Sequence, residues 1–458
     1  MTAASAPWSA YEPSRDAPWN LRRVVHLHRR AGFAATWGEI QRDLTDGPRA
    51  SIERVLAGKA RADGVPKDFE RTAALLADRT IAADEPNRLK AWWVYRMLFG
   101  PDPLTERLAL MWHNHFATSN LKVRDLAAMR RQNEILRTHA RAPFGQLLRA
   151  VLRDPAVLVW LDAPANRKEH PNENLARELM ELFTLGIGAY TEADVKEAAR
   201  ALTGWSVEDG EFREVPRHHD DGEKTILGRR GAKWNGSDLL DCLLAHPATA
   251  ERLAGRVCGL LLGEGAVPAD AIQAMAAGLR EHELDVGWAM ATVLRSRTFF
   301  AEAQLGNRVV GPVEYVVGAA RALELFDPPP STLVLADWAA RLGQDLFYPP
   351  NVGGWPGGRA WISTRAVIGR ANYAAALAGG DGVGRPKLDA LALAKRHGRG
   401  GDLDDFLAFA SELLLGGAPT TAWRERILKA LAPKGGALDD TARRAVAVIL
   451  ASPEAQLA

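Results

Sequence analysis

Cysteine and long apolar runs are scarce in this sequence. Only two cysteines, Cys242 and Cys258, occur among 458 residues, which is too few for a zinc site built from cysteine thiolates. Both lie in leucine-rich stretches of helical character, so we expect buried free thiols rather than a disulfide. No run of about 18 apolar residues occurs, and no membrane span is therefore expected.

An excess of charge of one sign is also missing. The 58 lysines and arginines nearly balance the 56 aspartates and glutamates, and the two signs are interspersed. A nucleic-acid-binding protein would show a clustered basic excess, so we expect no nucleic-acid partner. Residues 1–25 show no basic region followed by an apolar one, which is the pattern of a secretory signal. The chain as written is therefore expected to be cytoplasmic.

Helical periodicity is abundant. Capping boxes, in which a threonine precedes an acidic residue by three positions, begin at Thr36 and Thr191. Strand-like alternation is scarce, and the one hairpin candidate is residues 205–215, with a turn at Asp209-Gly210. These patterns predict an all-α fold: a single large multi-helix domain with long irregular loops and at most one short β-hairpin.

The composition divides the chain into four parts. Residues 1–15 form an N-terminal tail, residues 16–378 the main helical domain, residues 379–389 a glycine-rich joint, and residues 390–458 a small helical C-terminal extension. Glycine-rich sequence of the kind found in the joint is typical of a flexible connection. The C-terminal extension is therefore the best candidate for a small subdomain.

The helix expected at 172–185 is amphipathic. At about 100° per residue, its polar residues form one stripe, made of Asn174, Arg177, Glu178 and Glu181. The stripe is either a solvated face with an Arg177–Glu181 pair or a site, because it lacks lysine and glutamine and lies between apolar stretches. The opposite face is apolar and should be buried; it contains Leu175, Leu179, Leu182 and Phe183.

Two histidines, His113 and His115, occur in the helix expected at 102–116. Their i,i+2 spacing separates them by about 200° on a regular helix, so an undistorted helix cannot present both to one metal ion. Either one is a satisfied core residue and the other a surface residue, or the helix ends near His113 and both rings reach a site.

A long irregular segment at 206–236 contains His219 and Lys224 among acidic residues. Its apolar residues argue against disorder, and loops of this length inside a compact protein are usually functional. The spacing of the acidic residues is not that of an EF-hand. The segment is either a charged surface turn or part of a site.

A second irregular segment, at 345–361, combines glycines with Trp355 and Trp361. The glycines allow positive φ and a close approach of the backbone. The segment has no G-K-[ST], so it is not a P-loop. It is either a packed connector or a contact surface.

Several stretches together resemble one bacterial family: "MWHNHFATS", "RQNEILRTHA", "DPAVLVWLD", "PNENLARELMELFTLGIGAYTEADVKEAARALTGW", "HDDGEKTILG", "GPVEYVVGAARAL" and "LGQDLFYPPNVGGWPGGRAWIS". From Trp19 to Ala378 the sequence is similar to a family of unknown function, domain of unknown function 1800. The resemblance implies a helical protein with no established activity. The family's motif blocks include His113, His115, Asn172, Glu173, Asn174, Arg177, Glu178, Glu181 and His219.

The resemblance also implies a partner and a second location. Genes of this family commonly lie beside genes of a sulfatase/alkaline-phosphatase-like family, domain of unknown function 1501. Many members of both families carry export signals, so a periplasmic location is the alternative to a cytoplasmic one.

The first functional hypothesis is an enzyme. Glu178, Glu181, His113 and His115 would be catalytic and would also hold a divalent transition metal, because mixed imidazole and carboxylate ligands suit zinc, iron or manganese. The expected ligand-binding residues are Asn172, Asn174, Arg177, His219, Lys224, Trp355 and Trp361.

The second hypothesis is a non-catalytic partner-binding or scaffold protein. Its polar motifs would form a structural network, and the aromatic loop Tyr348–Trp361 would dock the sulfatase/alkaline-phosphatase-like neighbour. A third hypothesis assigns the binding of a sugar or peptide to the same loop.

Overall fold

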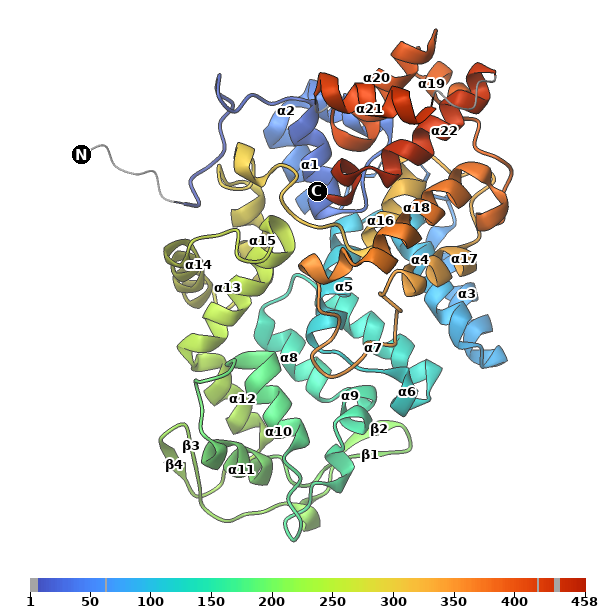
Figure 1. Cartoon of the computed structure of the whole chain (residues 1–458). Helices are drawn as coiled ribbons and strands as arrows, with labels where there is room; N and C mark the ends of the chain where they lie inside the picture. The colour runs from blue at the N-terminus through green and yellow to red at the C-terminus, as the bar shows by residue number, and fades with distance from the viewer. Residues whose placement is uncertain (1–6, 62–63, 418–419, 432–436) are drawn as a thin grey trace, which may run out of the picture.

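The computed structural model describes residues 7–61, 64–417, 420–431 and 437–458, and Figure 1 shows the whole chain. The first helices are α1 (Leu21–Ala31), α2 (Trp37–Leu56), α3 (Phe69–Ala83), α4 (Pro86–Phe99), α5 (Pro103–His115), α6 (Asn120–Val123), α7 (Leu126–Thr138), α8 (Phe144–Leu152), α9 (Pro155–Trp160), α10 (Asn174–Glu178) and α11 (Glu192–Ala201). The later helices are α12 (Gly236–Ala245), α13 (Pro247–Leu262), α14 (Ala269–Glu281), α15 (Val286–Leu294), α16 (Pro312–Ala322), α17 (Thr332–Arg341), α18 (Thr364–Gly379), α19 (Ala390–Arg396), α20 (Leu403–Leu415), α21 (Thr421–Leu431) and α22 (Leu438–Ala451). The prediction of an all-α domain is confirmed.

Helix starts follow the caps expected from sequence. The side chains of Thr36 and Thr191 accept hydrogen bonds from the backbone of Glu39 and Asp194, and both capping boxes are complete. Within α2 the helix is kinked at Gly47, whose φ is 82°, and Pro48 follows. The kink arises there because glycine tolerates a positive φ and proline cannot donate the next backbone hydrogen bond.

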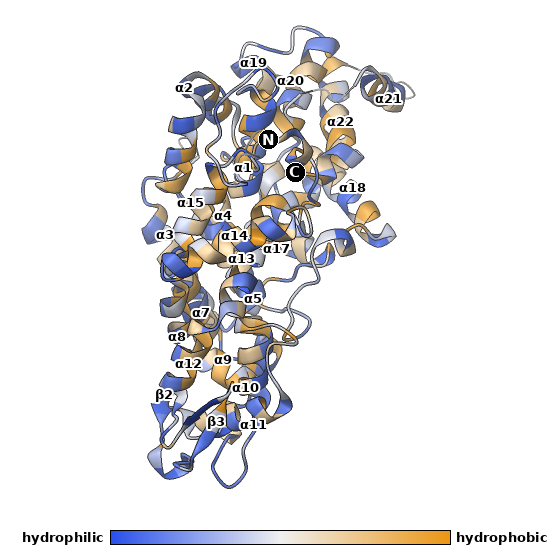
Figure 2. Cartoon of the chain, turned by 90° about the vertical axis from the view of Figure 1, so that its left-hand side faces the viewer, coloured by the Kyte–Doolittle hydropathy of each residue, from blue (hydrophilic) through white to orange (hydrophobic). Residues whose placement is uncertain are grey.

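Two short hairpins accompany the helices. β1 (Trp205–Glu208) pairs antiparallel with β2 (Glu211–Glu214) across the Asp209-Gly210 turn, as the sequence predicts. A second hairpin is formed by β3 (Lys224–Ile226) and β4 (Arg229–Gly231), so the described chain has one hairpin more than the sequence predicts. Its arms are too short for alternation to reveal them. Figure 2 shows that the loops at this end of the molecule are mostly hydrophilic.

The helices enclose two hydrophobic cores. The first core extends from α1 and α4 to the C-terminal helices and includes Trp93, Tyr373 and Ile449. The second core lies mainly among α5 and α8 to α15, with contributions from α1 and α2, and includes Trp112 and Leu179. Because α5 contributes side chains to both cores, it is buried on two faces. This central position of α5 determines the environment of its histidines.

Three further expectations from sequence can be compared with the fold. Cys242 and Cys258 are buried and free, as predicted. Among the helices of the described ranges, none combines the length and the apolar character needed to cross a membrane. The Gly-rich joint leads into α19 to α22, whose apolar side chains, such as Phe406 and Trp423, pack into the first core.

The predicted helix at 172–185 differs from a regular α-helix. It begins as α10 and continues from Leu179 to Thr184 as a π-helix. The Leu185 amide donates to the Met180 carbonyl at 2.8 Å, and the Thr184 hydroxyl donates to the Leu179 carbonyl at 2.7 Å. Both bonds span five residues, which widens the turn.

The apolar face of this segment is buried as expected, with one exception. Leu175, Leu179 and Phe183 are 1%, 0% and 3% exposed, whereas Leu182 is half-buried. A π turn rotates the side chains that follow it relative to a regular helix, which accounts for the exception.

Candidate functional site

The polar stripe of α10 lies partly in solvent and is paired differently from the expectation. Arg177 donates to both carboxylate oxygens of Glu192, at 2.9 and 2.7 Å, and to Glu173 at 2.9 Å. Glu181 instead accepts a hydrogen bond from the Tyr190 hydroxyl at 2.9 Å. The predicted Arg177–Glu181 pair is therefore wrong, because Glu192 at the start of α11 and Glu173 occupy the guanidinium.

Glu178 is the least engaged member of the stripe. Its side chain is half-buried and has no hydrogen-bond or ion-pair partner in the described part of the chain. Burial, and secondarily the charge of Glu181, raise the pKa of Glu178, while Arg177 opposes the shift. A carboxyl group with a raised pKa and free oxygens is better suited to general acid–base chemistry than an ordinary glutamate.

The two asparagines organise the start of α10. The Asn172 amide donates to the side chain of Asn166 at 2.9 Å, and Asn174 donates its backbone N–H to the Asn172 side chain at 2.9 Å. The Asn174 side chain donates to Asp162 at 3.2 Å. Asn166 also donates to the Ala199 carbonyl of α11 at 2.8 Å. These bonds connect the loop before α10 to α11.

His113 is fully buried on the face of α5 that points into the first core. Its ring packs against Trp93, Phe347 and Trp355, with ring centroids 5.3 to 5.5 Å apart. The Phe347 amide donates to His113 Nε2 at 3.3 Å, so the ring proton of the neutral form resides on Nδ1. Burial lowers the pKa of His113 to about 3, and the ring is neutral at physiological pH.

His115 lies on the opposite face of α5, in the second core. Its Nε2 lies 3.1 Å from the Phe183 carbonyl and donates the ring proton to it, since a carbonyl can only accept. Burial, then the charges of Arg256 and Arg252, lower its pKa well below the usual value.

Neither expectation for the histidines is therefore correct. Neither His113 nor His115 lies at the surface, because α5 is covered on both faces. The helix also does not end at His113 but continues through His115. Their spacing sends the two rings into different cores.

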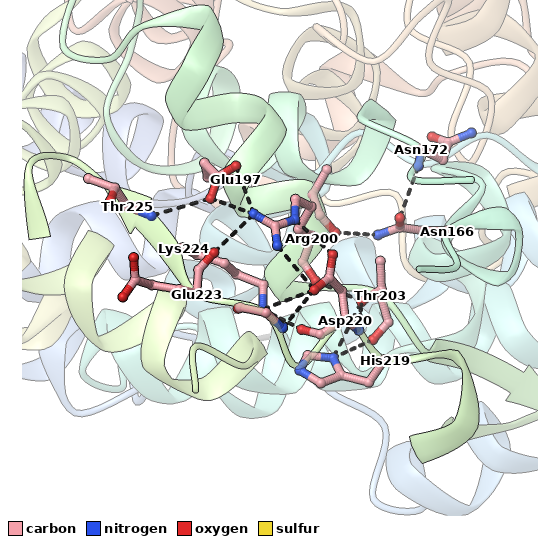
Figure 3. Close-up of polar contacts among 12 residues, drawn as sticks. Asn166, Asn172, Glu197, Arg200, Thr203, His219, Asp220, Glu223, Lys224 and Thr225 are labelled. Atoms are coloured by element: carbon pink, nitrogen blue, oxygen red, sulfur yellow. Dashed lines mark hydrogen bonds and ion pairs between the residues drawn. The ribbon is translucent and has the colours of Figure 1, made fainter. Parts of the chain in front are cut away.

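His219 belongs to a polar network around Arg200 of α11, shown in Figure 3. Arg200 donates to Asp220 at 2.7 and 3.1 Å and to Glu197 at 3.0 and 2.9 Å. His219 Nδ1 donates to the Thr203 carbonyl at 2.9 Å. Thr203 in turn accepts from the Asp220 amide at 2.8 Å. The network fixes the loop between the two hairpins against the C-terminal end of α11.

Lys224 completes this network from inside the loop. Its side chain is 0% exposed, and its ammonium donates to the carbonyls of Asp220 and Gly222. Burial lowers the pKa of Lys224, and the charge of Asp220 opposes the shift. An ammonium that is already bonded to two backbone carbonyls stabilises the loop conformation.

The aromatic loop packs on α5. Trp355 is 4% exposed, and its amide donates to the Asn114 side chain at 2.6 Å. Gly354 has φ of 79°, and a Cβ atom there would lie 2.2 Å from the Asn114 side-chain oxygen. Only glycine allows this approach. Trp361 is half-buried, and its indole N–H is buried without a hydrogen-bond partner.

These residues do not form the predicted metal site. Among the residues that the structure describes, no group of three or more His, Cys, Asp or Glu side chains could hold a metal ion. His113 and His115 contact backbone groups, whereas Glu178 and Glu181 lie on the stripe of α10 and the π-helix. Within the described ranges, no ion pair joins either histidine to either glutamate.

A cavity is lined by residues of α5, of α13, of the start of α16 and of the segment 357–361 that precedes α18. Figure 1 shows α5, α13 and α16 in the middle of the molecule. The cavity has a volume of about 190 Å³. It is lined by charged groups that the sequence interpretation missed, namely Arg107, Arg256, Glu264, Arg308 and Glu314. One signal was present in the sequence: Glu314 is the only acidic residue of the largely apolar α16, and a buried carboxylate requires a cationic partner.

Fold and site together define an all-α protein in which motif blocks distant in sequence meet around α5 and α11. The chain matches the model of a family described as "Protein of unknown function (DUF1800)" over residues 26–457, and it belongs to that family. The match confirms the resemblance and extends it through the C-terminal helices. No match was found among curated proteins or among solved structures.

Proposed function

We propose that this chain is a partner-binding protein whose polar motifs stabilise the fold. One observation carries the proposal: Ile362, just before α18, and Val367 and Ile368, in the first turns of α18, are 40%, 43% and 57% exposed. Single exposed apolar residues are ordinary, but neighbouring ones on one short segment mark contact surfaces in soluble proteins. We call this segment, together with the exposed Arg359 and Arg365, the docking face.

The charge of the docking face specifies the chemistry of its partner. From Val352 to Gly380 the sequence contains arginines but no aspartate or glutamate. An apolar surface with arginines at its edge complements a partner surface that is apolar at its centre and carboxylate-rich at its rim. Arginine and large apolar side chains are also frequent among the residues that dominate binding energy.

The bonding of the motif residues supports the structural part of the proposal. His113 accepts from the Phe347 amide, His115 donates to the Phe183 carbonyl, and Lys224 donates to two carbonyls. Each of these side chains therefore bonds to the backbone, as most side chains that stabilise a fold through hydrogen bonds do.

The sulfatase/alkaline-phosphatase-like protein implied by the family resemblance is the partner to test first. Binding of that purified protein to the immobilised chain would be measured by biolayer interferometry. Ile368→Asp places a charge in the centre of the docking face, and we expect it to weaken binding at least about tenfold, which corresponds to about 1.4 kcal/mol.

A matched control is Leu121→Asp, because Leu121 is an apolar residue that is 66% exposed at another position. It should bind like the unmodified chain. Unfolding curves of both variants establish that they remain folded. Equal binding by Ile368→Asp and the unmodified chain would refute the docking face.

One observation favours a second candidate, a metal-dependent or acid–base enzyme. Glu178 has unengaged oxygens and a raised pKa, and it directly precedes a π-helix, a feature that frequently occurs at functional sites. Metal analysis of the purified protein tests this candidate. A stoichiometric transition metal that is lost from Glu178→Gln would support it, whereas a metal-free protein would contradict the metal-dependent form.

A further inference from the structure

The cavity beside α5 contains more positive than negative charge. Arg107 and Arg308 both contact the single carboxylate of Glu314. A guanidinium nitrogen of Arg107 lies 2.9 Å from it. Arg308 donates to it from both terminal nitrogens, from Nη1 at 3.0 Å and from Nη2 by a second bond. The charges of these two arginines lower the pKa of Glu314 to about 2 against the effect of burial. The carboxylate is thus ionised at all ordinary pH values, yet it balances only one of the two cations.

A third cation, Arg256, lines the same cavity from α13. Its half-buried guanidinium has no hydrogen bond or ion pair to the protein within the described ranges. The acidic group whose charge acts on it is Glu264, an exposed side chain that also lines the cavity. Solvent screens an exposed carboxylate strongly, so Glu264 offsets Arg256 only in part.

Three N–H groups of the lining residues also have no partner. Arg107 Nε, Arg308 Nε and Trp361 Nε1 are buried and form no hydrogen bond, and Arg107 as a whole is 2% exposed. Such buried donors without a partner are rare in folded proteins, and each one carries a substantial desolvation penalty. All three belong to residues that line this cavity, although unpartnered arginine Nε groups also occur elsewhere in the described chain. A ligand with oxygen acceptors in the cavity would offer partners to such donors.

The remaining lining is largely apolar, with the amides of Asn114 and Gln344 as its other polar side chains. Leu110, Met111, Leu260 and Val309 contribute to the wall together with the indole of Trp361. Sites for small molecules typically combine such a wall with a few polar groups that fix orientation.

We propose that this cavity binds a small organic molecule that carries an oxyanion. The guanidinium of Arg256 would form the charge-assisted bonds, because its planar fork matches carboxylate, sulfate and phosphate oxygens. The apolar part of the ligand would lie against Trp361 and Leu260. This site goes beyond the docking face and does not depend on it.

Isothermal titration calorimetry with three probes tests the proposal and distinguishes the oxyanions. Benzoate, phenyl sulfate and phenyl phosphate share a ring and differ in the anionic group, and benzyl alcohol is the neutral control. We expect saturable binding of at least one anion and none of the alcohol. Arg256→Gln should weaken the binding about tenfold or more, as expected for loss of a charged hydrogen-bonding group.

Arg252→Gln is the matched control, because Arg252 lies one turn earlier on α13, donates to the Leu182 carbonyl at 2.7 Å and does not line the cavity. It should bind the probe normally. Trp361→Phe provides a second variant, which keeps an aromatic ring but replaces the indole and its N–H by a smaller phenyl group, and a severalfold loss is expected.

Three results would each overturn the proposal. They are no saturable binding of any of the three anions, equal binding of benzyl alcohol, and unchanged binding in both Arg256→Gln and Trp361→Phe. The partner measurement with Ile368→Asp is separate, so failure of the docking face and failure of the cavity are distinguishable.

Discussion

At the scale of single residues, buried polar groups in this protein are used mainly to satisfy the backbone. His113 and His115 show how: each forms one hydrogen bond to a backbone group through Nε2, while Nδ1 of each is buried without a partner. Neutral imidazoles tolerate such surroundings better than ionised groups. The identity of a motif residue therefore does not by itself indicate catalysis.

The packing of Leu179 gives the first prediction. Its side chain is 0% exposed within the second core. Leu179→Ala should lower the free energy of unfolding by about 2–5 kcal/mol, through lost transfer free energy and a residual cavity. Urea denaturation measures the change, with Leu121→Ala as an exposed control. A loss below about 1 kcal/mol would contradict the buried position.

The second prediction concerns pH and Asp154. This N-cap accepts from the amides of Ala156 and Val157, but its Oδ2 is buried without a partner. Burial raises the pKa of Asp154 from 3.8 to about 7, and the two backbone hydrogen bonds oppose the shift. Because the folded pKa is higher, this group's stabilisation is fully present below pH 3.8 and is lost as pH rises through about 7.

Asp154→Asn keeps a capping side chain but cannot ionise. Its stability relative to the unmodified protein should therefore increase with pH, by up to about 4 kcal/mol between about pH 4 and about pH 8. Urea denaturation of both proteins at the two pH values measures this difference. A pH-independent difference would show that Asp154 does not titrate abnormally.

At the scale of elements, irregular segments here are ordered by polar contacts to neighbouring helices. The loop around His219 is bonded to α11 through Arg200 and Thr203, and the aromatic loop is bonded to α5 through Asn114. Both loops contain motif blocks. Their conformations are therefore determined by specific bonds as much as by apolar packing.

The third prediction tests the first of these loops. Lys224→Met preserves most of the apolar stem but removes the ammonium, which leaves the carbonyls of Asp220 and Gly222 without their donor. We expect a loss of about 1–3 kcal/mol and faster amide hydrogen exchange across residues 216–226. Exchange measured by mass spectrometry would localise the change.

Arg230→Met is the control for Lys224→Met. Arg230 forms an ion pair with Glu223 at 2.6 Å, but both side chains are well exposed, and such pairs contribute at most about 1 kcal/mol. If the two variants exchange alike, Lys224 does not hold the loop.

At the scale of the whole molecule, the two cores meet at α5, and the C-terminal helices complete the first of them. Phe406, Trp423 and Ile449 belong to the same core as Val24 of α1. The Tyr315 hydroxyl of α16 donates to the Leu450 carbonyl at 2.9 Å. Contacts of this kind make segments distant in sequence depend on one another for stability.

The fourth prediction tests the proposed C-terminal extension. A chain that ends at residue 389 would expose the apolar side chains of the first core that α20 and α22 cover. We expect it to lack a cooperative unfolding transition, as followed by circular dichroism during heating. Supplying residues 390–458 as a separate chain should restore part of the structure. A truncated chain with an unchanged melting temperature would show instead that the extension is an independent unit.

The elements themselves were largely predictable from sequence. Thr36 and Thr191 began helices, and Asp209-Gly210 formed a hairpin turn. Each of these outcomes depends on hydrogen bonds and allowed dihedral angles within a few residues. The π-helix after Glu178 was not predictable in this way, because periodicity assumes the regular turn of an α-helix.

The sequence by itself determined the all-α class, the family, the burial of the two cysteines and the burial of most of the apolar face at 172–185, because periodicity and composition act locally. Only the tertiary structure decided which polar groups meet. Arg107, Arg256 and Arg308 come from separate segments, and His113 reaches a partner at Phe347. Contacts between such side chains depend on how whole helices pack, and no local sequence pattern encodes the packing of groups that are distant in the chain.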